Sequence, residues 1–265
     1  MSAPRLLVVV AHPDDETFGC GSVILHAVSR GWQVDVCCAT RGEAGEPDPA
    51  SGIPIEELAA ARERELRAAA KVLGVDKVTV LDHRDSGMSG DPAAGDLVDM
   101  PVDDLAADIG GEIARSEPQV VLTLDGSDGH RDHVHVRDAT IWAIQRAKQP
   151  EIRLFLHCLP RSLLRRWADH RRSIDPASPY LDVDEADLGT PDERITARVD
   201  TSRFVDRRWE AIVCHRSQRS PFHDLPTDLA HAFLATDHLQ QYWPAPRPGH
   251  DGADPFDQSR QNSQL

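Results

Sequence analysis

An unbroken apolar run, Leu6–Ala11, is the feature that most constrains how this chain folds. A strand that is apolar on both faces is typical of a parallel sheet covered by helices on each side. The polar segment His12-Pro13-Asp14-Asp15-Glu16 follows it directly. In open α/β folds, ligands bind beyond the carboxyl ends of the strands. The run therefore predicts a buried parallel strand that leads into a polar, chemically active loop.

Two interpretations fit the segment His12–Glu16. As a metal site, His12 and Asp15 supply one nitrogen and one oxygen ligand, which suits zinc or a similar divalent ion. Crowded, buried carboxylates repel one another unless a cation lies between them, and Asp14 is then left free to act as a base. As a simple turn, the acidic residues cap the next helix and face its positive end. The loops described below favour the metal site.

The chain continues as an alternation of strands and helices, which predicts an α/β fold with a Rossmann-like, doubly wound, mostly parallel sheet. The polar clusters each follow a strand and precede a helix, so they are expected together at the carboxyl edge of the sheet. Further strands are expected at Gln33–Thr40, Lys77–Leu81, Val120–Leu124, Ile152–Cys158 and Ile195–Val199. Helices are expected at Gly19–Arg30, Ile55–Leu73, Val102–Ser116, Val134–Lys148, Ser202–His215 and Leu229–Leu234.

The sequence predicts one domain over residues 1–265, with neither an internal repeat nor a linker. Residues 160–190 are rich in Arg, Asp and Pro without a clear period, so we expect a lid or an irregular insertion there. Residues 245–265 are rich in Pro, Gly, Gln and Ser and are expected to form a loose tail.

Composition excludes several classes of protein. A formal net charge of −15 argues against a nucleic-acid surface, which requires basic residues. No segment reaches the roughly 18 unbroken apolar residues of a membrane span. Because Met1–Pro4 leads straight into the first strand, we expect no signal peptide and a cytoplasmic protein. The five cysteines contain no C-x-x-C pair, so neither a disulfide framework nor a thiolate zinc site is indicated. A homo-oligomer is compatible with the sequence.

His130-x-x-His133, after the strand at Val120–Leu124, supplies the second half of the expected site. Two histidines and one carboxylate are a common zinc ligand set that leaves a position for water, so we assign His12, Asp15 and His133 as ligands. Asp14 is then the general base, and a protonated His130 together with the metal stabilises the oxyanion. Either Asp14 or His130 protonates the leaving amine.

The other polar residues near this segment have plainer explanations. Asp132 either orients a ligand histidine or caps the helix. His135, two residues after His133, points away from it on a helix and is taken as structural. His26 and His83 have no motif around them.

Together these segments resemble the LmbE/PIG-L family of zinc-dependent N-deacetylases, which act on N-acetylglucosamine-type sugars. The resemblance covers roughly residues 5–220. It implies His12, Asp15 and His133 as zinc ligands, Asp14 as base and His130 as the oxyanion-stabilising residue. Other divalent metals such as Fe²⁺ also suit this ligand set. The matching segments are Ala11–Glu16, Thr40–Gly45, the helix with Arg62 and Glu65, Arg84–Met88, Gly129–His133 and His215–Gln218.

The resemblance also implies that Glu43, Arg62 and Asp85 contact the sugar, and that the substrate is a small amino sugar or its conjugate. From the residues alone, an exposed ion pair with Glu65 or another nearby acid explains Arg62 equally well. The segment Arg84–Met88 resembles the branch of the family that deacetylates the glucosaminyl-inositol precursor of mycothiol or cleaves mycothiol conjugates.

Two positions depart from that pattern. Arg131 stands where the family usually has proline, and Asp128 stands where the mycothiol-precursor deacetylase has tyrosine. The sequence therefore leaves open whether the chain acts like the antibiotic-tailoring deacetylases of the family.

Two other functions compete with an N-deacetylase. A metal-dependent phosphoesterase also uses Asp and His at strand ends, but usually with a second metal or a phosphate cradle, and Gly19-x-Gly21 is an incomplete phosphate-binding motif. The other is a non-catalytic sugar-binding or scaffold protein with the same fold, and the presence of Asp14 and of all three proposed ligands argues against it.

Overall fold

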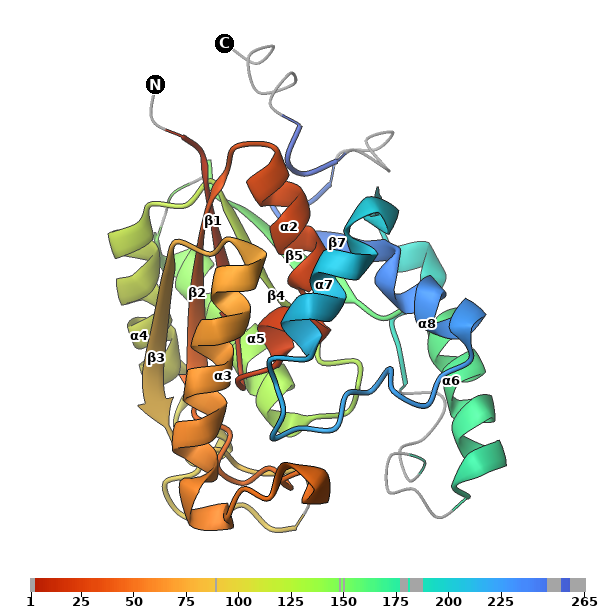
Figure 1. The fold of residues 1–265 in the computed structure, drawn as a ribbon. Coiled ribbons are helices and arrows are strands. Elements are labelled where there is room, and N and C mark those ends of the chain that lie inside the picture. The colour runs from red at the N-terminus through yellow and green to blue at the C-terminus, as the bar shows by residue number, and fades with distance from the viewer. Residues whose placement is uncertain are drawn as a thin grey trace.

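The described residues form one seven-stranded sheet in the order β3-β2-β1-β4-β5-β7-β6 (Figure 1). The structure is a computed structural model that describes residues 3–88, 90–147, 149, 151–176, 181, 188–246 and 254–257. The strands from β1 to β5 are parallel, whereas β7 pairs antiparallel with both β5 and β6. The predicted mostly parallel α/β sheet is confirmed. The strands are β1 Arg5–Val10, β2 Gln33–Thr40, β3 Lys77–His83, β4 Val120–Leu124, β5 Arg153–Cys158, β6 Ala197–Asp200 and β7 Thr236–Trp243.

Helices cover both faces of this sheet. They are α1 Asp15–Phe18, α2 Gly21–Ser29, α3 Leu58–Leu73, α4 Val102–Ser116, α5 Arg131–Ala147, α6 Arg161–Ile174, α7 Val205–Ile212 and α8 Thr227–Leu234. In Figure 1, α2, α3 and α7 lie in front of the sheet, with α4 and α5 behind it. No helix in the described ranges combines the length and the apolar character that a membrane span requires.

β1 shows why its sequence is apolar throughout. Leu6, Val8 and Val10 face one core, which contains side chains of α2, α3 and α7. Leu7 and Val9 face the other, which contains side chains of α4 and α5. Alternate residues of a strand point to opposite faces, so a central strand of a doubly wound sheet needs apolar residues at every position. β1 is thereby fixed in register, and with it the segment that begins at His12.

The first helical region differs from the expected helix Gly19–Arg30. The chain forms α1 immediately after Asp14, breaks at Gly19 and Cys20, and resumes as α2. A Cβ at Gly19 would lie 2.7 Å from Leu124 Cδ2 and 2.9 Å from the Asp15 carbonyl oxygen. Glycine is therefore required for this close approach to β4. The break places Asp15 in the first turn of its own short helix.

One further boundary and two further elements differ from the expectations from sequence. α5 begins at Arg131 instead of Val134, so that Asp132 and His133 lie in its first turn, and Lys148 lies outside the described residues. The 160–190 segment, expected to be irregular, contains the well-formed helix α6. The second half of that segment falls mostly outside the described residues. β7 was not predicted, because its polar residues obscure the strand pattern.

Part of the expected loose tail packs against the body of the protein. Phe256 is buried, and its carbonyl oxygen accepts a hydrogen bond of 3.3 Å from Trp32 Nε1. Asp254 lies 2.8 Å from both His26 Nε2 and an Arg30 guanidinium nitrogen. Residues 254–257 therefore pack against α2 and the turn that follows it, contrary to the prediction for this part of the tail.

We expect this contact to weaken in acid. Burial alone raises the pKa of Asp254, but hydrogen bonds from His26 and from the Phe256 N–H outweigh it and hold the pKa below its usual 3.8. A lowered pKa stabilises the folded state above the unfolded value, and this contribution is lost as the pH falls through the folded value. Urea unfolding at pH 7 should show Asp254→Asn about 1 kcal/mol less stable than the wild type. The difference should shrink below pH 4, and a constant difference down to pH 3 would refute this explanation.

Candidate active site

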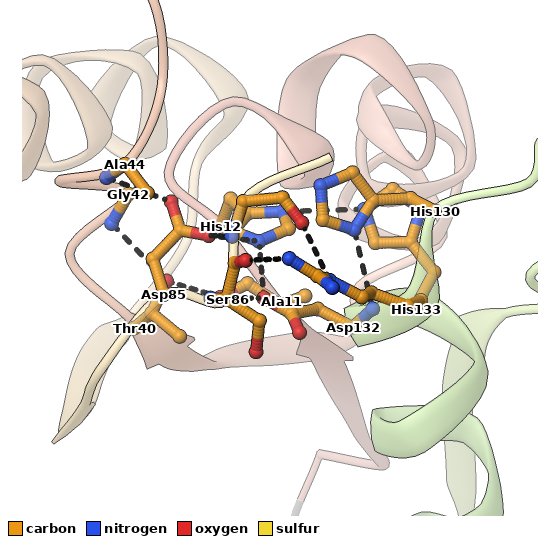
Figure 2. Close-up of polar contacts among 12 residues, drawn as sticks. Ala11, His12, Thr40, Gly42, Ala44, Asp85, Ser86, His130, Asp132 and His133 are labelled. Carbon is orange, nitrogen blue, oxygen red and sulfur yellow. Dashed lines mark hydrogen bonds and ion pairs between the residues drawn. The ribbon is translucent and has the colours of Figure 1, made fainter. Parts of the chain in front are cut away.

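Four loops meet at the carboxyl edge of the sheet, after β1, β2, β3 and β4. They bring together His12, Gly42, Asp85 and His130, and the start of α5 adds His133 (Figure 2). This is the convergence expected for a parallel sheet, in which these loops share one edge.

The three predicted ligand side chains converge on one point. His12 Nδ1 lies 3.3 Å from His133 Nε2. Asp15 reaches both rings, with Oδ2 at 3.5 Å from His12 Nδ1 and Oδ1 at 3.2 Å from His133 Nε2. Two ligands that each bind a tetrahedral zinc ion at about 2.0–2.1 Å stand roughly 3.3 Å apart. These donor atoms are therefore spaced as the ligands of one tetrahedral ion.

The electrostatics of this cluster favour a bound cation. Burial alone lowers the pKa of His133, but Asp128 and Asp15 outweigh it and raise the pKa to about 10. Burial likewise opposes the charged form of His12, and hydrogen bonds with Asp132, Asp15 and Asp85 raise its pKa well above the usual 6.5. The carboxylates thus stabilise positive charge at this point. A bound divalent ion supplies that positive charge in place of the protons on the two histidines.

On the far side of the His12 ring, Nε2 and two carboxylates form a second group of three atoms that could bind a metal ion. His12 Nε2 lies 3.1 Å from Asp132 Oδ2 and 3.4 Å from Asp85 Oδ1. Asp132 Oδ2 also accepts the Ser86 N–H at 3.0 Å. We interpret the two carboxylates as acceptors of a hydrogen bond from a protonated Nε2 of His12. The Nδ1 atom of His12 is then unprotonated and directed toward Asp15 and His133. Asp132, expected either to orient a ligand or to cap α5, thus lies behind His12.

Asp14 has a strained backbone and a buried carboxylate. Its φ of +124° is one that residues with a side chain rarely adopt, and such strain persists only where neighbouring contacts impose it. Arg62 supplies those contacts, since its Nη2 donates to the Pro13 carbonyl at 2.7 Å and to Asp14 Oδ2 at 3.0 Å. Burial raises the pKa of Asp14 to about 6, although the charge of Arg62 opposes this. Asp14 is thus a carboxylate that accepts protons near neutral pH.

His130 lies beside both ligand histidines but has different electrostatics. Its ring is 4.8 Å from that of His133 and 4.5 Å from that of His12, measured between centroids. Burial, helped by the charges of His12 and His133, lowers the pKa of His130 to about 4. Its Nδ1 accepts the Asp132 N–H at 3.2 Å, which leaves the proton on Nε2. This differs from the protonated form expected from sequence, since a neutral His130 is the form that these contacts stabilise.

The three residues expected to contact a sugar differ in how many of their polar atoms are left free to bind it. Arg62 is buried, is bonded to Asp14 and also donates to the Gly42 carbonyl at 2.7 Å, so it is not an exposed partner of Glu65. Asp85 is buried and accepts the N–H groups of Ala44 and Gly87. Glu43 accepts the Asp85 N–H through Oε1, while its Oε2 is buried without a partner among the described residues.

Arg131 connects α5 to the loop that carries Asp85. Its Nε donates to the Gly87 carbonyl and its Nη1 to the Gly90 carbonyl, both at 2.8 Å, and its Nη2 donates to the Ser86 carbonyl. Proline, the residue expected in the family at this place, makes none of these contacts. Arg131 therefore connects Ser86, Gly87 and Gly90 to the start of α5.

Replacing Arg131 by alanine should lower the free energy of unfolding by about 1–3 kcal/mol, because three hydrogen bonds to backbone carbonyls are lost. Urea denaturation measures this, with Arg146→Ala on the exposed surface of the same helix as a control expected within about 0.5 kcal/mol of wild type. Equal stability of the two variants would show that the contacts of Arg131 contribute nothing.

Sequence reasoning missed three residues that support this site. Asp128 lies against His133, as discussed below. His215 is buried and its Nε2 lies 2.8 Å from Glu16 Oε1, which connects α1 to the segment after α7. Arg208 donates to carbonyl oxygens at the end of α1. Only His215 lay in a motif singled out from sequence, and spacing alone gave no signal for the other two.

Comparison with known proteins identifies the family to which this chain is similar. Residues 7–144 match the family described as PIG-L: GlcNAc-PI de-N-acetylase. A protein from Geodermatophilus obscurus named 1D-myo-inositol 2-acetamido-2-deoxy-alpha-D-glucopyranoside deacetylase is 32% identical, over 89% of this chain and 91% of the relative.

Two solved structures share the fold at low sequence identity. N,N'-diacetylchitobiose deacetylase from Pyrococcus horikoshii is 20% identical with a TM-score of 0.59, over 91% of this chain and 84% of that one. The 4-carboxy-2-hydroxymuconate hydratase GalB from Pseudomonas putida is 18% identical with a TM-score of 0.60, over 93% of this chain and 99% of that one. Because a deacetylase and a hydratase share this fold, function must be argued from the site.

Proposed function

Because the chain belongs to the PIG-L family of de-N-acetylases, we propose that it is a metal-dependent hydrolase that removes an acetyl group from an N-acetylglucosamine-type sugar carrying a further substituent. The observation that carries this proposal is the convergence of His12 Nδ1, Asp15 and His133 Nε2 within 3.2–3.5 Å of one another.

We propose zinc as the metal, held by His12, Asp15 and His133. The set of two imidazole nitrogens and one carboxylate suits zinc and leaves a position open, although Fe²⁺ also accepts such ligands. Both histidines and Asp15 are buried, and carboxylates surround the two rings. A divalent ion bound there supplies Lewis acidity toward the amide carbonyl.

Asp14 is the residue that we assign to proton transfer. Asp15, Asp85, Asp128 and Asp132 each contact a ligand histidine, whereas the Asp14 carboxylate accepts a hydrogen bond from Arg62. Asp14 is therefore free to take a proton from the attacking water and to return it to the nitrogen of the leaving amine. Arg62 holds the carboxylate in place, and its charge limits how far burial raises the pKa of Asp14.

His130 is assigned to the oxyanion. Backbone donation from Asp132 to Nδ1 keeps the proton on Nε2, so the ring can donate a hydrogen bond to the carbonyl oxygen as negative charge develops there. Glu43 is assigned to a sugar hydroxyl, because its Oε2 is buried and has no partner among the described residues. Asp85 and Arg62 hold the surrounding loops.

The function is tested by measuring primary amine released from a panel of N-acetylglucosaminides. The panel contains free N-acetylglucosamine, its inositol conjugate, chitobiose and a glycoside with a bulky aglycone. We expect zinc-dependent release that a chelator abolishes, with conjugates preferred to the free sugar. No release from any member by protein with zinc bound would refute this substrate class. A phosphate monoester arm, expected to be inert, tests the alternative hydrolase.

A further inference from the structure

Asp128, in the loop between β4 and α5, contacts both histidines of the segment that follows it. Its Oδ2 lies 2.6 Å from His133 Nδ1. Its Oδ1 accepts a hydrogen bond of 3.1 Å from the backbone N–H of His130. The Asp128 side chain is 31% exposed, so it lies at the outer edge of the site while His133 is buried.

The short contact with Asp128 determines which nitrogen of His133 is available for a ligand. A neutral imidazole carries one proton, and a carboxylate beside Nδ1 keeps that proton on Nδ1. Nε2 then presents its lone pair toward Asp15 and His12, which lie 3.2 and 3.3 Å away. Asp132 stands in the same relation to His12, at 3.1 Å from Nε2. Each ligand histidine therefore has at least one carboxylate on the side that faces away from the convergence point.

The loop that carries Asp128 is itself fixed. Asp125 Oδ1 accepts the N–H of Ser127 at 3.0 Å and its hydroxyl at 2.8 Å, and Asp125 Oδ2 accepts the Thr190 hydroxyl. The Gly189 N–H donates to the Ser127 carbonyl at 2.8 Å. These contacts determine the backbone path on the N-terminal side of Asp128 independently of His133. The carboxylate is thus preorganised, which a group that positions a ligand requires.

We propose that Asp128 is a positioning residue of the metal site, which fixes the orientation and tautomer of His133 and the backbone of His130 at once. The inference rests on the proposed function, because it assumes a metal held by His12, Asp15 and His133. The sequence marks Asp128 only as a departure from the family pattern, and the assignment depends on the two contacts of its carboxylate.

The experiment compares zinc affinity between wild-type protein and the variants Asp128→Ala, Asp128→Asn and Asp104→Asn. Asp104 is exposed in the first turn of α4, away from the site, so Asp104→Asn controls for the loss of a charge. Affinity is measured by competition with a chromophoric chelator, and the visible spectrum of the cobalt-substituted protein reports the ligand geometry. Circular dichroism confirms folding.

We expect Asp128→Ala to weaken zinc binding by about 10- to 100-fold and to change the cobalt spectrum. Asp128→Asn should lie between Asp128→Ala and the wild type, since its amide oxygen still accepts a hydrogen bond but carries no charge. If Asp128→Ala does not fold, Asp128→Asn decides alone. Zinc affinity within about twofold of the wild type with an unchanged cobalt spectrum would overturn the proposal.

These readouts separate the inference from the proposed function. Wild-type protein that binds zinc yet releases no amine would refute the substrate class while leaving the affinity comparison decisive. Wild-type protein that binds neither zinc nor cobalt would overturn both proposals.

Discussion

Asp14→Asn should lower the rate of amide hydrolysis by about 10²- to 10⁴-fold, which is the usual contribution of a general base. The amide has the size of the carboxylate and still accepts a hydrogen bond from Arg62, but it does not take a proton from water. Because Asp14 is not among the three converging ligands, zinc affinity should stay within about twofold of the wild type. Steady-state amine release and chelator competition on the same preparation measure both quantities.

A second substitution at this position separates catalysis from folding. Glycine adopts a φ of +124° without the strain that a side chain causes, and this gain offsets the loss of the contact with buried Arg62. Asp14→Gly should therefore be inactive and similar to the wild type in stability. Asp104→Asn serves as the control and should retain full activity. An active Asp14→Asn variant would remove Asp14 from the mechanism, whatever its stability.

Arg208→Met should lower the free energy of unfolding by about 3–5 kcal/mol, the range observed when one partner of a buried charged network is removed. Arg208 is 1% exposed and donates to the carbonyls of Thr17, Phe18 and Gly19 at the end of α1. It also lies 3.8 Å from the buried carboxylate of Asp237. The variant leaves three carbonyls and one carboxylate without this donor.

The matched control is Arg207→Ala, one residue earlier on the exposed side of α7. Arg207 pairs with Glu210 on the surface, and its replacement should change stability by no more than about 0.5 kcal/mol. Urea unfolding of the two variants gives the comparison. A loss below about 1 kcal/mol for Arg208→Met would mean that α1 keeps its place without this guanidinium.

Hydrophobic pattern and chain order were sufficient to predict the half of the fold that carries the site. The apolar run of β1 predicted a central strand, because residues facing both cores must be apolar. Polar residues after β1 and β4 then had to meet at one edge, which brought His12 and His133 together. Such inferences succeed because they depend on topology and not on individual side-chain contacts.

The sequence failed where a tertiary contact overrides the local pattern. β7 is rich in polar residues, yet pairing with β5 on one side and β6 on the other makes it a strand. The helix α6 was not predicted, because its many arginines leave only a narrow apolar face, formed by Leu163, Leu164 and Ala168. Phe256 lies in a segment of loose composition, but its burial against Trp32 decides the position of that part of the tail.

Within the site, sequence identified the types of residue but not the partners of each. It gave no reason to connect Asp128 to His133 or to separate Arg62 from Glu65. It also gave no reason to connect Arg131 to the carbonyls of Ser86, Gly87 and Gly90. Burial beside two histidines, which favours a neutral His130, became apparent only in the structure. These errors share one cause, which is that hydrogen-bond partners far apart in sequence follow from the fold.

The position of the metal tests the central claim most directly. Crystals grown with zinc and measured at the zinc absorption edge locate the ion by its anomalous signal. We expect one ion bound by His12 Nδ1, the Asp15 carboxylate and His133 Nε2. An ion on the opposite side of the His12 ring, between Nε2, Asp85 and Asp132, would contradict this account. So would an ion bound by His130 in place of Asp15.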